Sequence, residues 1–248
     1  MSVLLPPWMV RPTAAVLAPL LAGQGAQVRR RTPVLPEPPG PRDGVTGTGP
    51  LLALLVVGES TAAGVGARGQ HEGLAARLAD ELGRRAHRTV AWRAVARSGV
   101  SAREAHRELV PTARSRSADV TIVVLGVNDT LRLRAPARWR ADVAAIVTDL
   151  ERAAAPGATT LLAGVPDLAG FPALPAPLRT VLGAHARTLD RELGHLARGQ
   201  RTVHHVPLPR FGPEVFAQDG FHPGAAGYRT WATQLADTAL PRLAPPSR

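Results

Sequence analysis

The sequence predicts a three-layer α/β sandwich, in which a parallel sheet lies between two layers of helices. From residue 51 onward, apolar runs of strand length alternate with longer amphipathic segments. Two of these runs, Leu51–Val57 and Val120–Leu125, consist mainly of valine, leucine and isoleucine, which is typical of strands buried on both faces. Because strands alternate with helices, we expect right-handed crossovers between parallel strands.

Five strands and five helices are expected between residues 51 and 240. The strand candidates are Leu51–Val57, Val90–Ala94, Val120–Leu125, Thr159–Gly164 and Thr202–Val206. The helix candidates are His71–Ala86, Ala102–Arg114, Pro136–Ala154, Pro177–Ala197 and Pro223–Leu240. Ligands of such sheets bind at the carboxyl ends of the strands, so polar residues that directly follow a strand are the site candidates.

Composition excludes several classes of site. The chain has 248 residues, which suits one domain, and its 45% hydrophobic content is enough for a core. All 30 basic residues are arginine, so a P-loop lysine and a Schiff-base lysine are excluded. The lack of cysteine excludes disulfides, thiolate catalysis and cysteine-based zinc sites. The net charge of +11 fits a nucleic acid, a membrane surface, an acidic ligand or merely scattered surface arginines, and the 4% aromatic content disfavours nucleic acid.

Residues 1–50 are predicted to form an N-terminal apolar extension and a Pro/Gly-rich arm, ahead of a domain over residues 51–243. The longest uncharged stretch, Pro12–Val28, is shorter than the roughly 20 apolar residues of a membrane-spanning helix. Three alternatives remain: a signal or anchor segment, a helix on an anionic membrane surface next to Arg29, Arg30 and Arg31, or an extension packed on the domain. Without a convincing signal peptide, we expect a cytoplasmic protein.

Ser60 is the candidate nucleophile, at the end of the first predicted strand in the segment LLVVGEST. A serine that ends a strand and opens a helix can use the helix N-terminus, whose free N–H groups favour developing negative charge. The alternative is a serine that only caps a helix. The segment is not a G-x-S-x-G elbow, because residue 62 is alanine. The spacing of Gly58, Gly64 and Gly66 matches neither common nucleotide-binding motif.

Gly99 and Asn128 follow the second and third predicted strands. A glycine lets the backbone approach a substrate closely, and an amide side chain at a strand end can donate an N–H to an oxyanion. The alternatives are a turn glycine and an Asn-Asp turn. Asp129 is expected to fix this loop rather than to do chemistry.

Asp219 and His222 lie three residues apart near the C-terminus, in the segment QDGFHPGAAGY. At this separation the carboxylate can hold the imidazole, fix its tautomer and stabilise the imidazolium. The alternative is a surface aspartate with a nearby histidine. His204 and His205 are neighbours in a strand and point to opposite faces, so we expect no metal site there, and no cofactor motif is present.

Together, these motifs resemble the SGNH/GDSL hydrolase family of serine esterases and lipases. Four sequence blocks of that family occur in order over roughly residues 51–240: Gly58-Glu59-Ser60, Gly99, Gly126-x-Asn128-Asp129 and Asp219-x-x-His222. One departure is Glu59, where the family usually has aspartate. The resemblance implies a flavodoxin-like fold with a parallel five-stranded sheet between helices.

The resemblance also implies a role for each site residue. Ser60 would attack the carbonyl carbon, His222 would transfer the proton and Asp219 would orient His222. The backbone N–H groups of Ser60 and Gly99 and the side-chain amide of Asn128 would bind the oxyanion.

Two loops are candidates for substrate binding. Val165–Pro175 is apolar except for Asp167, and would line an acyl pocket or cap the core. Leu131–Arg140 follows Asn128 and contains four arginines and Trp139. Among these, Arg132 and Arg134 are candidates to hold a phosphate or carboxylate of the substrate, the alternative being a solvated first helical turn.

The sequence therefore predicts a serine esterase that acts on a small-molecule or lipid ester. A carbohydrate deacetylase or a thioesterase would use the same residues. A non-catalytic module that binds a membrane surface through residues 1–31 is the alternative of a different class. Acyl length, the alcohol and the oligomeric state are not determined by the sequence.

Overall fold

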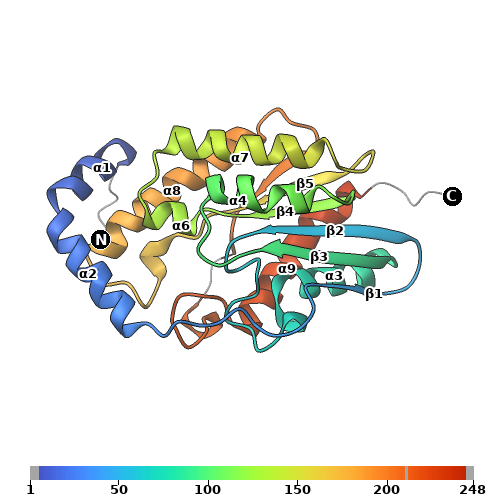
Figure 1. Cartoon of the computed structure of the whole chain (residues 1–248), viewed down its shortest axis with the longest axis horizontal. Helices are drawn as coiled ribbons and strands as arrows, with labels where there is room; N and C mark the ends of the chain where they lie inside the picture. The colour runs from blue at the N-terminus through green and yellow to red at the C-terminus, as the bar shows by residue number, and fades with distance from the viewer. Residues whose placement is uncertain (1–5, 210–211, 244–248) are drawn as a thin grey trace.

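The computed structural model describes residues 6–209 and 212–243, and contains a six-stranded sheet with helices on both faces (Figure 1). The strands are β1 Asp43–Thr46, β2 Leu51–Gly58, β3 Thr89–Ala96, β4 Val120–Val124, β5 Thr159–Ala163 and β6 Val203–Val206. The helices are α1 Pro7–Val16, α2 Ala18–Arg31, α3 Leu74–Ala86, α4 Ala102–Glu108, α5 Val110–Ala113, α6 Val127–Leu131, α7 Pro136–Glu151, α8 Leu178–Ala197 and α9 Ala225–Ala239.

The strand order is β1-β3-β2-β4-β5-β6, and β2 to β6 are parallel. Without β1, this is the flavodoxin-like order, so the predicted three-layer architecture is confirmed. The predicted count of five strands is wrong, because β1 pairs antiparallel with β3 at the edge of the sheet. This four-residue strand (DGVT) contains aspartate and glycine and lacks an apolar run, so the sequence pattern gave no strand signal.

Alternate side chains of β2 enter the two cores, one on each face of the sheet. Leu55 and Val57 pack in the core with Trp139 of α7. Leu54 and Val56 pack on the other face with Trp231 of α9. All four β2 residues are at most 2% exposed, which explains why the strand is apolar without alternation.

One predicted helix and one turn considered for the sequence differ from the observed structure. The helix expected over Ala102–Arg114 is split into α4 and α5, and Pro111, which has no backbone N–H, lies at the start of α5. The Asn-Asp turn considered for residues 128–129 is instead part of the short helix α6, which follows Gly126. Ser101 and Glu104 form a capping box at the start of α4.

The N-terminal helices α1 and α2 pack on α8, beside the sheet (Figure 1). Val10 and Ala14 of α1 and Leu21 of α2 are buried in the same core as α8. The side chain of Gln24 donates to the carbonyl of Ala176 at 2.7 Å and accepts the N–H of Leu178 at 3.1 Å. Within the described part of the chain, no helix has the length and apolar character needed to span a bilayer.

The arm between α2 and β1 contacts two of the loops that carry predicted site residues. The carboxylate of Glu37 accepts the backbone N–H of Ser98 at 2.7 Å and pairs with Arg42. The buried amide of Gln70 donates to the carbonyls of Pro38 and Ala63 at 3.1 and 3.0 Å. The arm is therefore attached both to the loop after β3 and to the turn after β2.

Candidate active site

Three strands end together at one edge of the sheet. Gly58, the last residue of β2, is paired with Ala96 of β3 and Val124 of β4. Ser60 and Asn128 come soon after β2 and β4, and Gly99 follows β3 three residues later, so the three predicted residues belong to neighbouring loops. Figure 1 shows that this edge faces the side of the molecule where α1 and α2 lie.

Ser60, His222 and Asp219 are joined by a chain of hydrogen bonds. The Oγ of Ser60 lies 2.9 Å from Nε2 of His222, and Nδ1 of His222 lies 2.6 Å from Oδ2 of Asp219. The other carboxylate oxygen of Asp219 accepts the backbone N–H groups of Phe221 and His222, each at 3.0 Å. The structure thus brings together residues that are 162 positions apart in the chain.

Asp219 is held as a carboxylate next to this imidazole. Its residue is only 5% exposed, and burial by itself would raise the pKa of the carboxyl group. The hydrogen bonds from the His222 side chain and from two backbone N–H groups outweigh burial, so the pKa is lowered. An ionised Asp219 can both orient His222 and stabilise its protonated form.

The segment after Ser60 is a series of turns, not the helix considered in the sequence interpretation. The N–H of Ala63 donates to the carbonyl of Glu59, and that of Val65 donates to the carbonyl of Ser60, each at 3.0 Å. Gly66 has φ +97°, and a Cβ there would lie 2.3 Å from the carbonyl oxygen of Pro223. Glycine therefore lets the turn that carries Ser60 contact the loop that carries His222.

Glu59 anchors the loop that contains Asn128. Its carboxylate accepts the N–H of Val127 at 2.9 Å, the N–H of Asn128 at 3.0 Å and the side-chain amide of Asn128. The residue is 2% exposed, and burial raises its pKa to about 7, although the hydrogen bonds from Asn128 and Val127 lower it. The amide nitrogen of Asn128 carries two hydrogens, so a second N–H is left for another acceptor.

The backbone N–H groups of Ser60 and Gly99 are available as donors. Within the described residues, neither makes a hydrogen bond to the protein. Gly99 has φ +81°, a left-handed conformation that favours glycine, and a Cβ there would contact nothing within 4 Å. The guanidinium of Arg132 donates to the carbonyl of Gly99 at 3.0 Å and fixes the other side of this residue.

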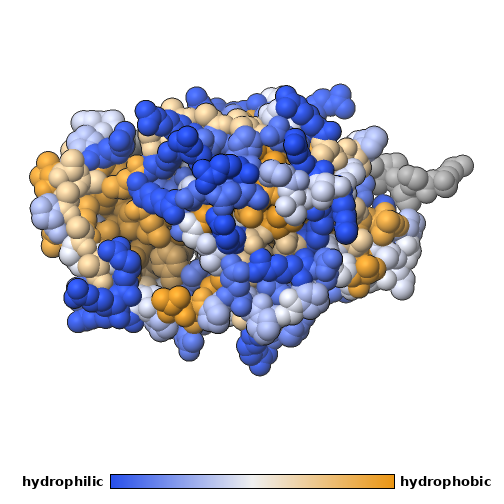
Figure 2. Space-filling model, in the orientation of Figure 1, coloured by the Kyte–Doolittle hydropathy of each residue, from blue (hydrophilic) through white to orange (hydrophobic). Residues whose placement is uncertain are grey.

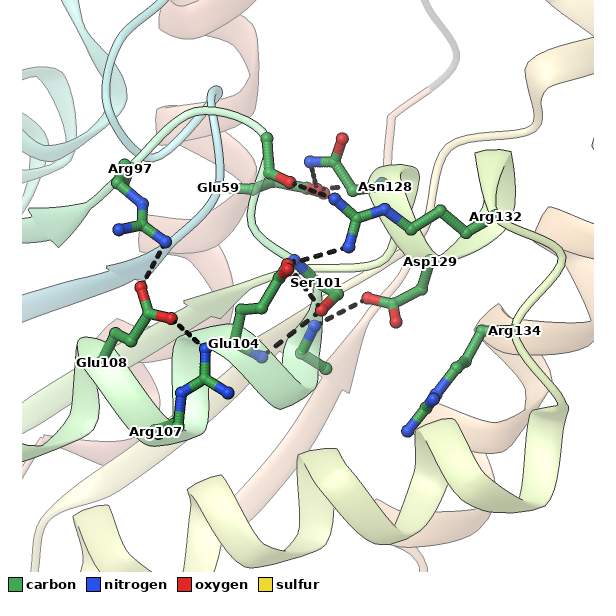
Figure 3. Close-up of polar contacts among 12 residues, drawn as sticks. Glu59, Arg97, Ser101, Glu104, Arg107, Glu108, Asn128, Asp129, Arg132 and Arg134 are labelled. Atoms are coloured by element: carbon green, nitrogen blue, oxygen red, sulfur yellow. Dashed lines mark hydrogen bonds and ion pairs between the residues drawn. The ribbon is translucent and has the colours of Figure 1, made fainter.

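A polar network holds the loop after β3 against α6 (Figure 3). Asp129 accepts the N–H of Ala102 at 2.8 Å, in agreement with the loop-fixing role expected for it. Arg132 also pairs with Glu104 at 2.8 Å, and Glu104 accepts the N–H of Ser101 at 2.7 Å. The loops of Gly99 and Asn128 are thereby connected by side chains that the sequence pattern did not relate to each other.

The residues predicted to bind substrate have partners within the protein. Arg132 has the contacts described above, Arg134 pairs with Asp142 at 2.6 Å, and Asp167 pairs with Arg187 at 2.8 Å. Their role in substrate binding stays a prediction. Trp139, in the same segment as Arg132 and Arg134, is fully buried in the core.

A small cavity adjoins Ser60. Its volume is about 40 Å³, and its walls include Ser60, His222, Phe171 and Phe221 together with other mainly apolar residues. The predicted loop Val165–Pro175 contributes Pro166 and Phe171 to the cavity, while Leu168 and Leu174 of this loop are buried in the core. Among the described residues, no group of three or more histidines and acidic residues has the arrangement of a metal site.

The pattern of this site agrees with a comparison to protein families. The model of the GDSL-like Lipase/Acylhydrolase family matches residues 56–230. This chain belongs to that family. As a GDSL-like hydrolase of the SGNH type, it is an enzyme that hydrolyses ester bonds. No curated protein matches it.

Solved structures share the fold of this GDSL-like hydrolase. TesA is 24% identical, with a TM-score of 0.60 over 77% of this chain and 99% of TesA. The psychrotrophic esterase EstA from Pseudoalteromonas sp. is 18% identical, with a TM-score of 0.58 over 76% and 97%. Axe2, an acetylxylan esterase from Geobacillus stearothermophilus, is 16% identical, with a TM-score of 0.54 over 79% and 94%. At these identities the likeness concerns the fold alone.

Several residues that shape the site of this GDSL-like hydrolase could not be assigned to it from the sequence pattern. Glu59 differs from the aspartate that the family usually has, and this difference does not indicate its contacts with Asn128, although Glu59 directly precedes Ser60 in a buried segment. Glu37 lies in the predicted arm, where its contact with Ser98 has no sequence signal. Three of the four phenylalanines follow residue 210, close to His222, and this clustering in an aromatic-poor chain was a usable signal.

Proposed function

We propose that this GDSL-like hydrolase is a serine esterase that works through Ser60, His222 and Asp219 and forms an acyl-enzyme intermediate. The observation that carries the proposal is the chain of hydrogen bonds from Asp219 through His222 to Ser60, at the edge of a cavity. The two distances of this chain are within the range of a nucleophile, its general base and the group that orients the base.

In the first half of the reaction, the Oγ of Ser60 attacks the ester carbonyl carbon while Nε2 of His222 takes the hydroxyl proton. The carbonyl oxygen becomes an oxyanion. Its donors are the N–H groups of Ser60 and Gly99 and the second N–H of the Asn128 amide. When the tetrahedral intermediate collapses, the C–O bond to the alcohol breaks and His222 delivers its proton to the alcohol oxygen.

In the second half, water attacks the carbonyl carbon of the acyl-Ser60 ester, and His222 takes a proton from this water. Collapse of the second tetrahedral intermediate breaks the bond to Oγ, releases the carboxylic acid and returns the proton to Ser60. Asp219 stays ionised throughout, and its charge stabilises the imidazolium of both steps.

The substrate class is tested by assaying the purified protein on p-nitrophenyl esters, an acetylated oligosaccharide and an acyl thioester. We expect ester hydrolysis to be measurable. Preference for the acetylated sugar or the thioester would identify a carbohydrate deacetylase or a thioesterase that uses the same residues. If all three substrate classes stay intact, the chain is instead a non-catalytic module, and the proposed mechanism is wrong.

We also propose that α1 and α2 bind an anionic membrane surface and hold the enzyme there. Trp8, Val16 and Leu20 on these helices are 76%, 81% and 50% exposed, and Arg29–Arg31 end α2. Figure 2 shows apolar residues at the end of the molecule that these helices form, next to hydrophilic ones. Apolar and basic side chains together favour anionic headgroups. Of the predicted membrane segment 1–31, residues 1–5 lie outside the described residues.

Sedimentation with phosphatidylcholine vesicles, with and without phosphatidylglycerol, tests this surface. We expect pelleting only with the anionic lipid, weakened by salt and lost in a Trp8→Asp/Leu20→Asp double variant. Val34→Asp is the matched control, because Val34 is 93% exposed but lies on the arm outside both helices. Equal pelleting of the double variant and the wild type would contradict the proposal.

A further inference from the structure

Two hollow spaces adjoin each other near the candidate active site, and they differ greatly in size. The inner cavity, which contains Ser60 and His222 in its wall, has a volume of about 40 Å³. The outer groove, which includes Asp167, Arg187 and Arg191, has a volume of about 610 Å³. A single water molecule needs a cavity volume of about 10–15 Å³. The inner cavity therefore holds only about three groups the size of a water molecule.

A wall shared by both spaces separates them. Pro166, Phe171, Leu208 and Phe216 line the inner cavity and also the outer groove. Pro166 and Phe171 come from the loop after β5, and Leu208 and Phe216 follow β6. This loop and the segment after β6 therefore meet between the cavity and the groove.

The aromatic part of this wall is packed against the catalytic loop. The ring centroids of Phe171 and Phe216 are 5.2 Å apart, and those of Phe171 and Phe221 are 5.0 Å apart, both edge to face. The ring of Phe221 in turn lies 5.4 Å from that of His222. Moving Phe171 aside would disturb packing that extends to the imidazole, so an acyl chain does not displace it without cost.

We propose that Phe171 and Phe216 restrict the acyl group carried by Ser60 to a short one, with about two to four carbons. The proposal rests on the proposed role of Ser60 as nucleophile. The inner cavity suits the acyl side because its walls are mainly valine, leucine, proline and phenylalanine. Removal of either ring joins the cavity to the outer groove, and this gives a longer chain a continuous path.

The experiment compares kcat/KM for p-nitrophenyl acetate, butyrate, hexanoate and octanoate. We expect the wild type to prefer acetate or butyrate. In Phe171→Ala and Phe216→Ala, the ratio of octanoate to acetate activity should rise about tenfold or more, since each methylene that gains a place contributes to transition-state binding. Phe216→Trp, which adds volume to the wall, should shift the preference in the opposite direction.

Leu174→Ala is the matched control for loosening of the loop. Leu174 is 4% exposed and belongs to the same loop as Phe171, but it lines neither space. This variant should keep the wild-type ratio, and thermal melting shows which variants are folded. Phe216 is only partly buried, so Phe216→Ala tests the proposal even if Phe171→Ala does not fold.

Failure of the proposed role of the two rings can be distinguished from failure of the proposed esterase function. An active wild type that prefers octanoate, or folded alanine variants with an unchanged ratio, would overturn the role of the two rings and leave the esterase mechanism intact. A wild type that is inactive on these esters, on the acetylated oligosaccharide and on the acyl thioester would remove the proposed function, and the inference about acyl length with it.

Discussion

Replacement of Ser60 by alanine is expected to lower ester hydrolysis by a factor on the order of 10⁶. The variant keeps His222 and the oxyanion donors but lacks the atom that forms the acyl-enzyme. The Oγ of Ser60 makes its hydrogen bond to His222, and no other within the described residues, so the melting temperature should change little. The measurement is kcat/KM on p-nitrophenyl acetate with the wild type and Ser60→Ala purified in parallel.

Residues that act as a unit give a sharper form of this test. If Ser60 and His222 act in one step, the double variant Ser60→Ala/His222→Ala should be no slower than Ser60→Ala alone. A multiplicative loss would mean that the two residues act independently. Retention of about a tenth of the activity by Ser60→Ala would show that another group is the nucleophile, because loss of the true one leaves far less.

Replacement of Glu59 by glutamine is expected to lower kcat by about 10²-fold, with little change in KM. A glutamine has one acceptor oxygen, whereas three N–H groups point at the two carboxylate oxygens of Glu59. Its amide N–H₂ would face either the N–H of Val127 or both donors of Asn128, so in either orientation the loop that carries Asn128 loses an acceptor. A loss in kcat alone is the signature of an interaction that matters in the transition state.

Two further variants distinguish loss of the positioning of Asn128 by Glu59 from general damage to the fold. Glu59→Asp keeps both acceptor oxygens and has the residue that the family usually carries, so it should retain more activity than Glu59→Gln. Asn128→Ala removes the oxyanion donor itself, and adding Glu59→Gln to it should cost little further activity. If the losses of Asn128→Ala and Glu59→Gln multiply, Glu59 does not act through Asn128.

The pH dependence of stability provides a second measurement on Glu59. Its pKa of about 7 in the folded protein lies above the ordinary value of 4.5, so the folded state binds more protons between these two values. The free energy of unfolding therefore falls as pH rises through this window. Glutamine does not titrate. Between about pH 5 and pH 8, the wild type should lose about 2 kcal/mol of stability relative to Glu59→Gln in urea denaturation.

The parallel sheet could be predicted because its strands carry a strong local signal. Runs such as Leu51–Val57 must be apolar throughout, since both faces of the strand are covered, and this property is visible in any single sequence. Strand β1 could not be predicted in the same way. Its four residues pair with an open edge of β3, and the position of that edge is a property of the assembled sheet.

The candidate site shows the same division between local and tertiary information. Ser60, Asn128 and His222 could be found because each follows a strand or precedes a helix within a recognisable motif. Glu37 could not be found, because its partner Ser98 is 61 residues away and nothing around Glu37 marks the contact. The segment directly after Ser60 forms turns rather than a helix, and its Gly66 packs against the carbonyl of Pro223 in the His222 loop, a contact between distant segments.

The positions of the parallel strands along the chain, and the residue types that follow them, can be predicted from the sequence because both depend on local pattern. How these residues are held in place depends on contacts that form only in the assembled fold. Glu59 binds the Asn128 loop, and Arg132 holds Gly99. The assembled fold also places Phe171 and Phe216 between a small cavity and a large groove. Such contacts join segments far apart in the chain, so their geometry exists only after the sheet has formed.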